Sequence, residues 1–191
     1  LMKVSKQIEK KGSSSGSNDK PAASKAADKV VDVIKRFMKE CIPLMHLICT
    51  QGIKDRHWKD IKALTGLDFE SGPSTTLKQV YDIGLHLQVP TIEDTCVSAA
   101  KENGLEKAMD KMEGMWQSME FGTKEWRGSR ILTGIDDIQT ELDDQIVKTQ
   151  AMRGSRYITP YIERVTRWEK ILTDLQDIID NWLKVQSTWL Y

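Results

Sequence analysis

The chain has 191 residues, enough for one domain or for a piece of a larger protein, but too few for two large domains. Its 28 basic residues equal its 28 acidic residues and are interleaved with them, so no basic patch predicts binding to nucleic acid or to an acidic membrane surface. No apolar run approaches the roughly 20 residues that span a bilayer, and the N-terminus lacks the apolar stretch of a secretory signal. We therefore expect an intracellular protein that binds neither nucleic acid nor membrane.

Three cysteines, Cys41, Cys49 and Cys96, occur without CxxC spacing and in an odd number. This pattern argues against both a disulfide framework and a structural zinc site. We expect all three to be small buried apolar residues in a reducing compartment.

Residues 1–28 are predicted to form a flexible linker, because Gly, Ser, Lys, Asp, Pro and Ala dominate between Lys10 and Ala27. A helical domain is predicted over residues 29–191. Its first helix begins near Ser24 and carries an apolar stripe, which Pro43 ends or kinks. The stripe consists of Val30, Ile34, Phe37 and Cys41.

The stretch IKDRHWKDIKALTG predicts a short helix with Trp58, Ile61 and Leu64 on one side and Gly66 as its stop signal. The loop LDFESGPST follows, and a second short helix is predicted to end near Gly84. The stretch VPTIEDT then opens a long helix, for which Thr91 is the predicted N-cap.

The apolar face of this long helix changes direction along its length. Ile92 and Cys96 lie on one side, whereas Met109 and Met112 lie on a side rotated by roughly 140 to 180° at 100° per residue. Either the helix breaks at Asn103-Gly104, or it continues and changes its packing partners. We favour the continuous helix.

Between Phe121 and Thr133 the helical period fails, and the glycines permit a short β-hairpin. A helix is predicted next, with an apolar arc of about 80° and a solvated acidic face, and residues 152–155 end it. The arc consists of Ile135, Ile138, Leu142, Ile146 and Thr149, and the acidic face of Asp136, Asp137, Glu141, Asp143 and Asp144.

The final helix, from Pro160 to Tyr191, carries the strongest periodic signal. Its apolar positions predict one continuous buried stripe, and at about 1.5 Å per residue the helix is about 45 Å long, more than a compact domain needs. We expect a core or interface seam at Trp168, Leu175, Trp182 and Trp189. The predicted fold class is all-α, with elongated antiparallel helical bundles, long helices and one possible small β-hairpin.

No grouping predicts chemistry, so we expect no catalytic, cofactor-binding or metal-binding residues. The stretch GLDFESGPST lacks the spacing and the lysine of a phosphate loop. His46, His57 and His86 share no metal-ligand spacing, and a nucleophilic pair of Cys49 with His46 has no orienting acid nearby. The methionines from Met109 to Met119 are typical of an adaptable core.

Several ordered blocks resemble the linker region of dynein heavy chains, in particular the axonemal inner-arm members. The blocks are GIKDRHWKDI at 52–61, KENGLEKAMDKMEGMW at 101–116, ILTGIDDIQTELDDQIVKTQAMRGSRYITPYIERVTRWEKIL at 131–172, and IIDNWLKVQSTWLY at 178–191. The resemblance covers Val30 to Tyr191, and residues 1–28 do not contribute to it. Arg156 departs from the proline expected after Gly-Ser.

The resemblance implies a mechanical lever of a minus-end-directed microtubule motor that drives ciliary and flagellar beating in the axoneme. The implied partners are the AAA+ ring and the rest of the heavy chain, other dynein subunits, and microtubule doublets. ATP and magnesium would be bound in the ring, outside this chain, so the chain itself would hold no cofactor and would not be an enzyme. The breaks in the helical pattern suggest hinges at Gly66, Gly72, Gly122, Gly128 and Gly154.

Two rival functions remain open. A non-motor helical scaffold would bind partner helices through the tryptophan seam, and a GxxxxGK[ST] motif farther along the parent chain would argue against it. A small enzyme with a His, Cys and carboxylate site would contain bound metal and a clustered site.

Overall fold

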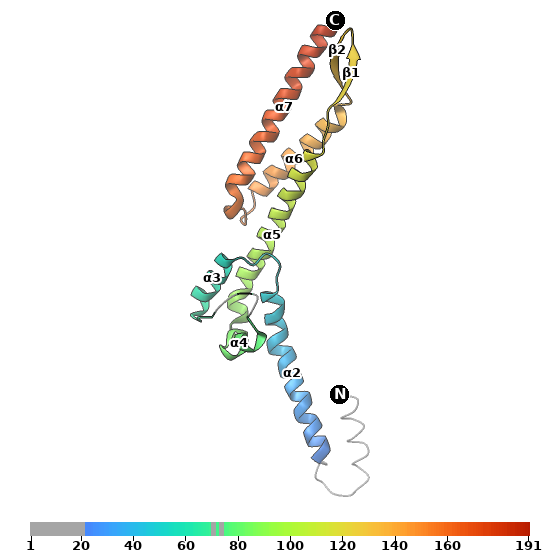
Figure 1. The fold of residues 1–191 in the computed structure, drawn as a ribbon. Helices are drawn as coiled ribbons and strands as arrows, with labels where there is room; N and C mark the ends of the chain where they lie inside the picture. The colour runs from blue at the N-terminus through green and yellow to red at the C-terminus, as the bar shows by residue number, and fades with distance from the viewer. Residues whose placement is uncertain (1–21, 70–71, 73–74) are drawn as a thin grey trace. The chain divides into compact units, whose positions relative to one another are not determined.

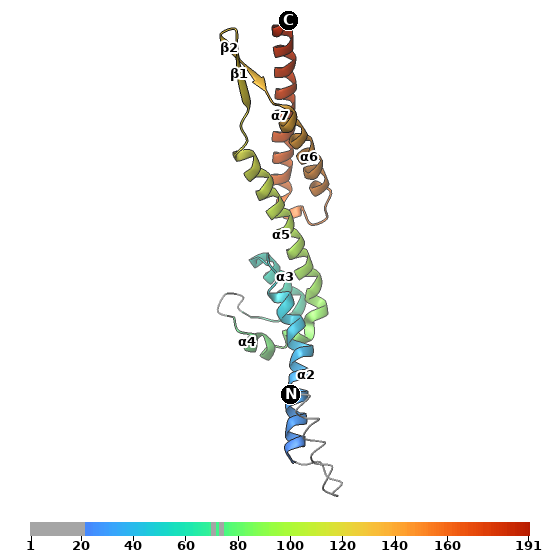
Figure 2. The same ribbon diagram turned by 90° about the vertical axis from the view of Figure 1, so that its right-hand side faces the viewer.

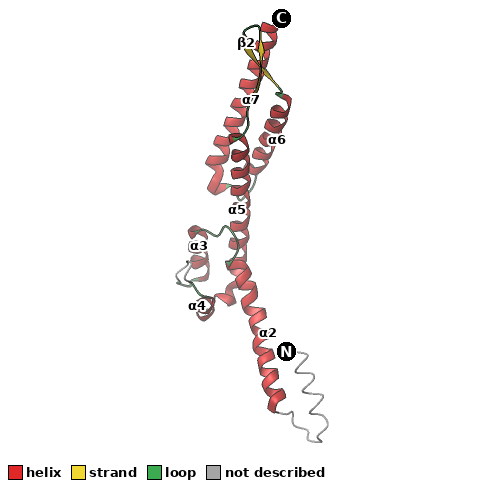
Figure 3. Ribbon diagram, turned by 45° about the vertical axis from the view of Figure 1, so that its right-hand side comes forward, coloured by secondary structure: helices red, strands yellow, loops and turns green. Residues whose placement is uncertain are grey.

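The computed structural model describes residues 22–69, 72 and 75–191 (Figure 1). Within these residues the chain is mainly helical with one two-stranded antiparallel sheet, which confirms the predicted fold class of helices and one small hairpin (Figure 3). The chain divides into two compact units, Leu1–Ala99 and Ala100–Tyr191. In chain order, the elements are α2 (Ala22–Ile48), α3 (Asp55–Thr65), α4 (Leu77–Asp82), η1 (Leu85–Gln88), α5 (Val89–Gln117), β1 (Gly122–Trp126), β2 (Ser129–Thr133), α6 (Asp136–Arg153), η2 (Thr159–Tyr161) and α7 (Ile162–Leu190).

Helix α2 begins at Ala22, so the last seven residues of the predicted linker, 22–28, are helical, while residues 1–21 lie outside the described part. Pro43 lies inside the helix, which continues to Ile48. Of the predicted stripe, only Cys41 is buried, and Val30, Ile34 and Phe37 are exposed. The reason is that α2 packs within the first unit mainly through its C-terminal half, where Leu44 is fully buried.

The core of the first unit forms where α2, α3, α4, η1 and the start of α5 meet. It consists of Leu44, Ile61, Val80, Leu85, Ile92 and Cys96.

Helix α3 confirms the predicted short helix and its stop signal. Gly66 adopts a left-handed conformation with φ 67°, and its amide N–H donates to the Lys62 carbonyl at 2.9 Å. Of the three residues predicted to share one side, Ile61 is buried, Trp58 is partly buried and Leu64 is exposed, while His57, one turn before Ile61, is also buried. The ring Nδ1 of His57 accepts the Lys54 amide N–H at 3.0 Å, which satisfies a donor at the start of the helix.

Thr76 caps α4 through a reciprocal pair of bonds with Gln79, and Gly84 follows in a left-handed conformation with φ 82°. The 3₁₀ helix η1 then leads directly into α5 at Val89. The prediction that Thr91 is the N-cap is therefore wrong. Thr91 lies in the first turn of α5, where its hydroxyl donates a hydrogen bond to the side-chain oxygen of Gln88.

Helix α5 runs without a break through Asn103 and Gly104, which confirms the predicted continuous helix. Ile92 and Cys96 belong to the core of the first unit, whereas Met109 and Met112 belong to a core of the second. The change of apolar face therefore reflects a change of packing partners.

In the second unit, α6 and α7 form an antiparallel pair, and the β-hairpin lies beside the C-terminal half of α7 (Figures 1 and 2). The hairpin turn places Arg127 at φ 47° and Gly128 at φ 79°, and two positive φ angles give the twist that a two-residue hairpin turn requires. Gly122 faces Thr133 across the ladder, where an added Cβ would lie 2.7 Å from the Thr133 carbonyl oxygen.

Helix α6 confirms the predicted apolar arc and its end before Gly154. Four of the five predicted acidic residues are exposed, Glu141 is partly buried, and Lys148 pairs with Asp144 one turn away. Within the described residues, no helix is both long and apolar enough to cross a membrane.

Two connected cores fill the second unit. One consists of Ile135, Ile138, Leu142, Leu172 and Ile179, and the other of Met109, Met112, Ile158 and Val165.

Candidate functional site

Helix α7 carries two adjoining apolar faces rather than the single buried stripe that the sequence predicts. The inner face packs against α5 and α6 and includes Val165, Leu172 and Ile179, which are at most 2% exposed. Trp168 and Leu175 are partly buried against these cores.

The outer face of α7 is open to solvent. Trp182 is 53% exposed and Trp189 is 55% exposed, so the described part of the chain does not cover them, and their place in an interface seam remains a prediction. At 100° per residue, both are rotated by roughly 80 to 100° from Leu172, which is buried in the core that α6 and α7 share. The same face also exposes Ile171, Ile178 and Val185.

The β-hairpin is fixed to α7 by one side-chain amide. The N–H of Leu132 donates to Oε1 of Gln186 at 2.8 Å, and Nε2 of Gln186 donates to the carbonyl oxygen of Leu132 at 3.0 Å. The Gln186 amide thus pairs with β2 as a neighbouring strand would. Sequence reasoning missed this contact, because the periodicity of a helix says nothing about a bond 54 residues away.

A hollow of about 520 Å³ lies between the hairpin and the outer face of α7. It is mainly apolar, a character typical of surfaces that bind other protein chains. Its lining includes Arg130, Ile131, Ile178, Trp182, Val185 and Trp189.

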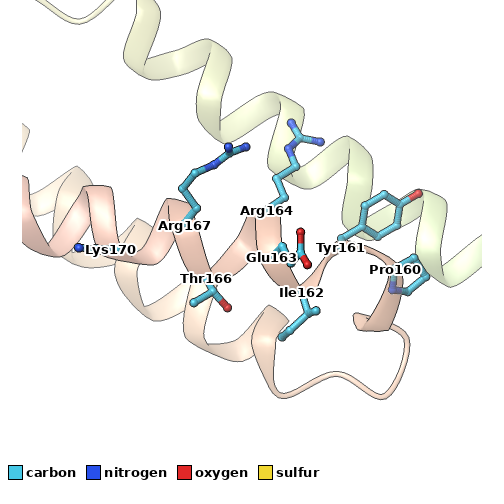
Figure 4. A pocket seen from close by; sticks show the side chains of 8 residues that line it. All are labelled: Pro160, Tyr161, Ile162, Glu163, Arg164, Thr166, Arg167 and Lys170. Carbon is cyan, nitrogen blue, oxygen red and sulfur yellow. The ribbon is translucent and has the colours of Figure 1, made fainter.

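A charged contact joins the beginning of α7 to α5. The guanidinium of Arg164 donates to both carboxylate oxygens of Glu113, at 3.0 and 2.7 Å, and to Asp110 at 2.7 Å. These hydrogen bonds, that to Glu113 first, raise the pKa of Arg164 further above its already high value. Tyr161 adds a hydrogen bond to Glu106 at 3.0 Å. Figure 4 shows Arg164 and Tyr161 directed toward the neighbouring helix.

A second hollow, of about 740 Å³, lies along this part of α7 (Figure 4). It is lined by one helix and the residues before it, among them Pro160, Ile162, Glu163, Thr166 and Lys170. The lining contains no His or Cys, the residue types that most often act as nucleophile, base or zinc ligand.

A buried polar chain connects α5 to α6. The indole Nε1 of Trp116 donates to Oε1 of Gln145 at 2.6 Å, and Nε2 of Gln145 donates to Glu141 at 2.9 Å. Gln145 is 1% exposed. Sequence reasoning passed over it as polar, although it lies one turn from Leu142 and from Thr149 on the buried arc.

The remaining candidate groups do not converge. Cys41 and Cys96 are buried, and burial raises the pKa of both thiols, whereas Cys49 is exposed against prediction. His86 stacks on Tyr81 with ring centres 3.9 Å apart. Across residues 22–69, 72 and 75–191, no group of three His, Cys, Asp or Glu side chains is placed to hold a metal ion.

The five predicted hinge glycines occupy different settings. Gly66 and Gly154 cap helices, Gly72 lies in the loop after α3, Gly122 is paired in the hairpin, and Gly128 forms its turn. A hinge role for each of them remains a prediction.

Over residues 1–191 the chain matches the protein family described as dynein heavy chain, N-terminal region 2. This match includes residues 1–28, which the resemblance seen in the sequence does not reach. The chain is 38% identical to human dynein axonemal heavy chain 3 over 176 residues, which are 91% of this chain and 4% of the relative. It is 43% identical to human dynein axonemal heavy chain 12 over 141 residues, which are 73% of this chain and 5% of the relative. The chain thus spans only a small part of the relatives it matches.

Proposed function

The chain belongs to the dynein heavy chain family, as its N-terminal region 2, and we propose that it acts in an axonemal heavy chain as a mechanical segment of the linker. In this role it transmits force that is generated elsewhere in the heavy chain. Its place of action is the axoneme of a cilium or flagellum, within a minus-end-directed microtubule motor.

The proposal assigns the chemistry of the motor to other parts of the heavy chain. ATP and magnesium are bound in the AAA+ ring, and this segment holds no cofactor and carries no catalytic residue. Its partners are the ring and the rest of the heavy chain, and through them the other dynein subunits and the microtubule doublets.

The contact of Arg164 with Glu113 and Asp110 is the observation that carries the mechanical role. A guanidinium that is hydrogen-bonded to two carboxylates resists displacement in several directions, because each charge-assisted bond has its own geometry. The contact lies at the first turn of a 29-residue helix, so a load along α7 reaches α5 through it. Continuous helices suit this task because they are rigid elements.

The test replaces Arg164 by Gln in a full-length axonemal heavy chain and measures microtubule gliding velocity together with ATP turnover. We expect slower gliding at nearly unchanged ATP turnover, because the ring still works while the force path yields. The matched control is Lys148→Gln, which removes the exposed ion pair of Lys148 with Asp144 within α6 and should leave velocity unchanged.

Equal gliding velocities of the Arg164→Gln variant and the unchanged motor, with helical content retained by circular dichroism, would contradict the mechanical role. A parallel fall of velocity and ATP turnover would also count against it, because it would indicate a damaged ring rather than a yielding force path.

The open apolar face of α7 favours a second candidate, a non-motor helical scaffold that binds partner helices. A phosphate-loop motif GxxxxGK[ST] farther along the same gene product would decide for the motor, because a scaffold has no need of a nucleotide site.

A further inference from the structure

Helix α5 contains a short stretch that belongs to neither core between which it runs. Ala99 is the last buried residue in the first part of the helix, and Met109 is the first in the second part. Within the described residues, the stretch 100–104, here called the joining turn, adds no side chain to any of the three hydrophobic cores. The division of the chain into two units falls at its beginning.

The joining turn carries polar residues where either apolar face of α5 would continue. At 100° per residue, Asn103 lies on the side of Cys96 and Ala99. Lys101 lies on the nearly opposite side, in line with Leu105. The joining turn therefore lacks the packing of an apolar face, from which most of the stability of a helix in a protein comes.

Asn103 and Gly104 are also weak helix formers. Glycine loses the most backbone entropy in a helix, and the asparagine side chain competes for hydrogen bonds of the backbone. Gly104 is exposed, and a Cβ added there would meet no atom within 4 Å apart from its own helix backbone, so no close packing requires glycine at this position. The two residues thus lower the stability of α5 where its packing is weakest.

We propose that α5 opens locally at the joining turn while the cores of both units stay intact, so that the helix can flex at this point. The opening frees the N–H groups of residues 104–108, which bond to the carbonyl groups of the joining turn. It requires no buried residue to leave its core, and local opening of this kind occurs where buried contacts are few. The inference concerns the local stability of α5 and does not depend on the mechanical role.

Hydrogen–deuterium exchange with mass spectrometry tests the proposal in the full-length heavy chain. Exchange rates are corrected for the intrinsic rate of each sequence and compared along α5. We expect the amides of residues 104–108 to exchange at least about tenfold faster than those of the flanking residues 95–99 and 110–114.

The variant Gly104→Ala should slow exchange at residues 104–108 about fivefold, because alanine is the better helix former. The matched control is Gly114→Ala, the same substitution in the same helix, at another exposed position with room for the Cβ. Gly114 lies beside Met112, which is buried, and Glu113, which is bonded to Arg164. The control should therefore leave exchange at residues 104–108 unchanged.

Two results would overturn the proposal. One is exchange at residues 104–108 that is no faster than in the flanking residues, which would show that α5 opens only as one unit. The other is the same effect of both alanine variants at residues 104–108, which would show that the joining turn has no opening of its own. Neither result bears on the force path through Arg164, which the gliding experiment tests separately.

Discussion

At the scale of single residues, the three thiols differ in a way that composition does not reveal. Cys41 and Cys96 are 4% and 1% exposed, and burial raises the pKa of both thiols, while Cys49 is exposed. The thiolate is the reactive form, so a raised pKa and restricted access both slow alkylation. We expect Cys49 to react quickly at pH 8 and the other two only after unfolding.

Mass spectrometry after brief treatment with iodoacetamide measures this difference, because each modified cysteine adds a fixed mass. The variant Cys49→Ser should leave the native chain almost unmodified. Equal labelling of all three cysteines in the native chain would show that the buried thiols are accessible.

Gln145 has a larger structural role than its residue type suggests. Its amide accepts the Trp116 indole N–H and donates to Glu141, so Gln145→Ala removes both bonds and leaves a small void. We expect the free energy of unfolding to fall by about 2 kcal/mol. Urea denaturation measures this free energy. The control is Gln150→Ala, which changes an exposed residue of the same helix. Equal midpoints for the two variants would contradict a stabilising role of Gln145.

At the scale of elements, the positions of the helices were largely predictable from the sequence, whereas the elements that pack against each helix were not. The stop at Gly66, the continuity of α5 and the hairpin between residues 121 and 133 follow from local chemistry, namely left-handed glycine, a rotated apolar face and a lost helical period. The exposure of Trp182 and Trp189 depends on which side of α7 the other helices cover, and the periodicity of one helix cannot specify where its neighbours pack. The prediction of Thr91 as the N-cap was wrong because the 3₁₀ helix η1 leads directly into α5, which therefore begins before Thr91.

The two faces of α7 predict opposite mutational effects. Leu172→Ala empties a core position that is 1% exposed and should lower the free energy of unfolding by about 3 kcal/mol. Ile178→Ala removes a side chain that is 58% exposed and should change the free energy of unfolding by only about 0.5 kcal/mol. Similar losses for both variants in thermal unfolding would mean that the outer face of α7 is covered within the chain.

At the scale of the whole molecule, the family was easier to predict from the sequence than the tertiary contacts were. The family relationship was predictable from ordered blocks of residues. The exposed outer face of α7 and the contact of Gln186 with Leu132 were not predictable, because both arise from the tertiary arrangement.

The hairpin offers a way to test whether a hinge matters for movement. Glu125 and Arg130 face each other across the ladder, so Glu125→Cys with Arg130→Cys allows a disulfide that stiffens the stretch from Gly122 to Gly128. In a full-length motor we expect slower gliding in the oxidised form than in the reduced form of the same variant. Unchanged gliding velocity on oxidation would count against a hinge in this stretch.

The pairing of Gln186 with Leu132 also bears on how the chain behaves at high concentration. An isolated hairpin leaves backbone donors and acceptors along its outer strands, and these can recruit further strands into fibrils. Here one amide occupies the middle of the β2 border, and Lys124 and Glu125 place charges along β1. The Gln186 amide thereby occupies the backbone groups of Leu132 through which a further strand would pair with β2, so we expect it to disfavour such stacking.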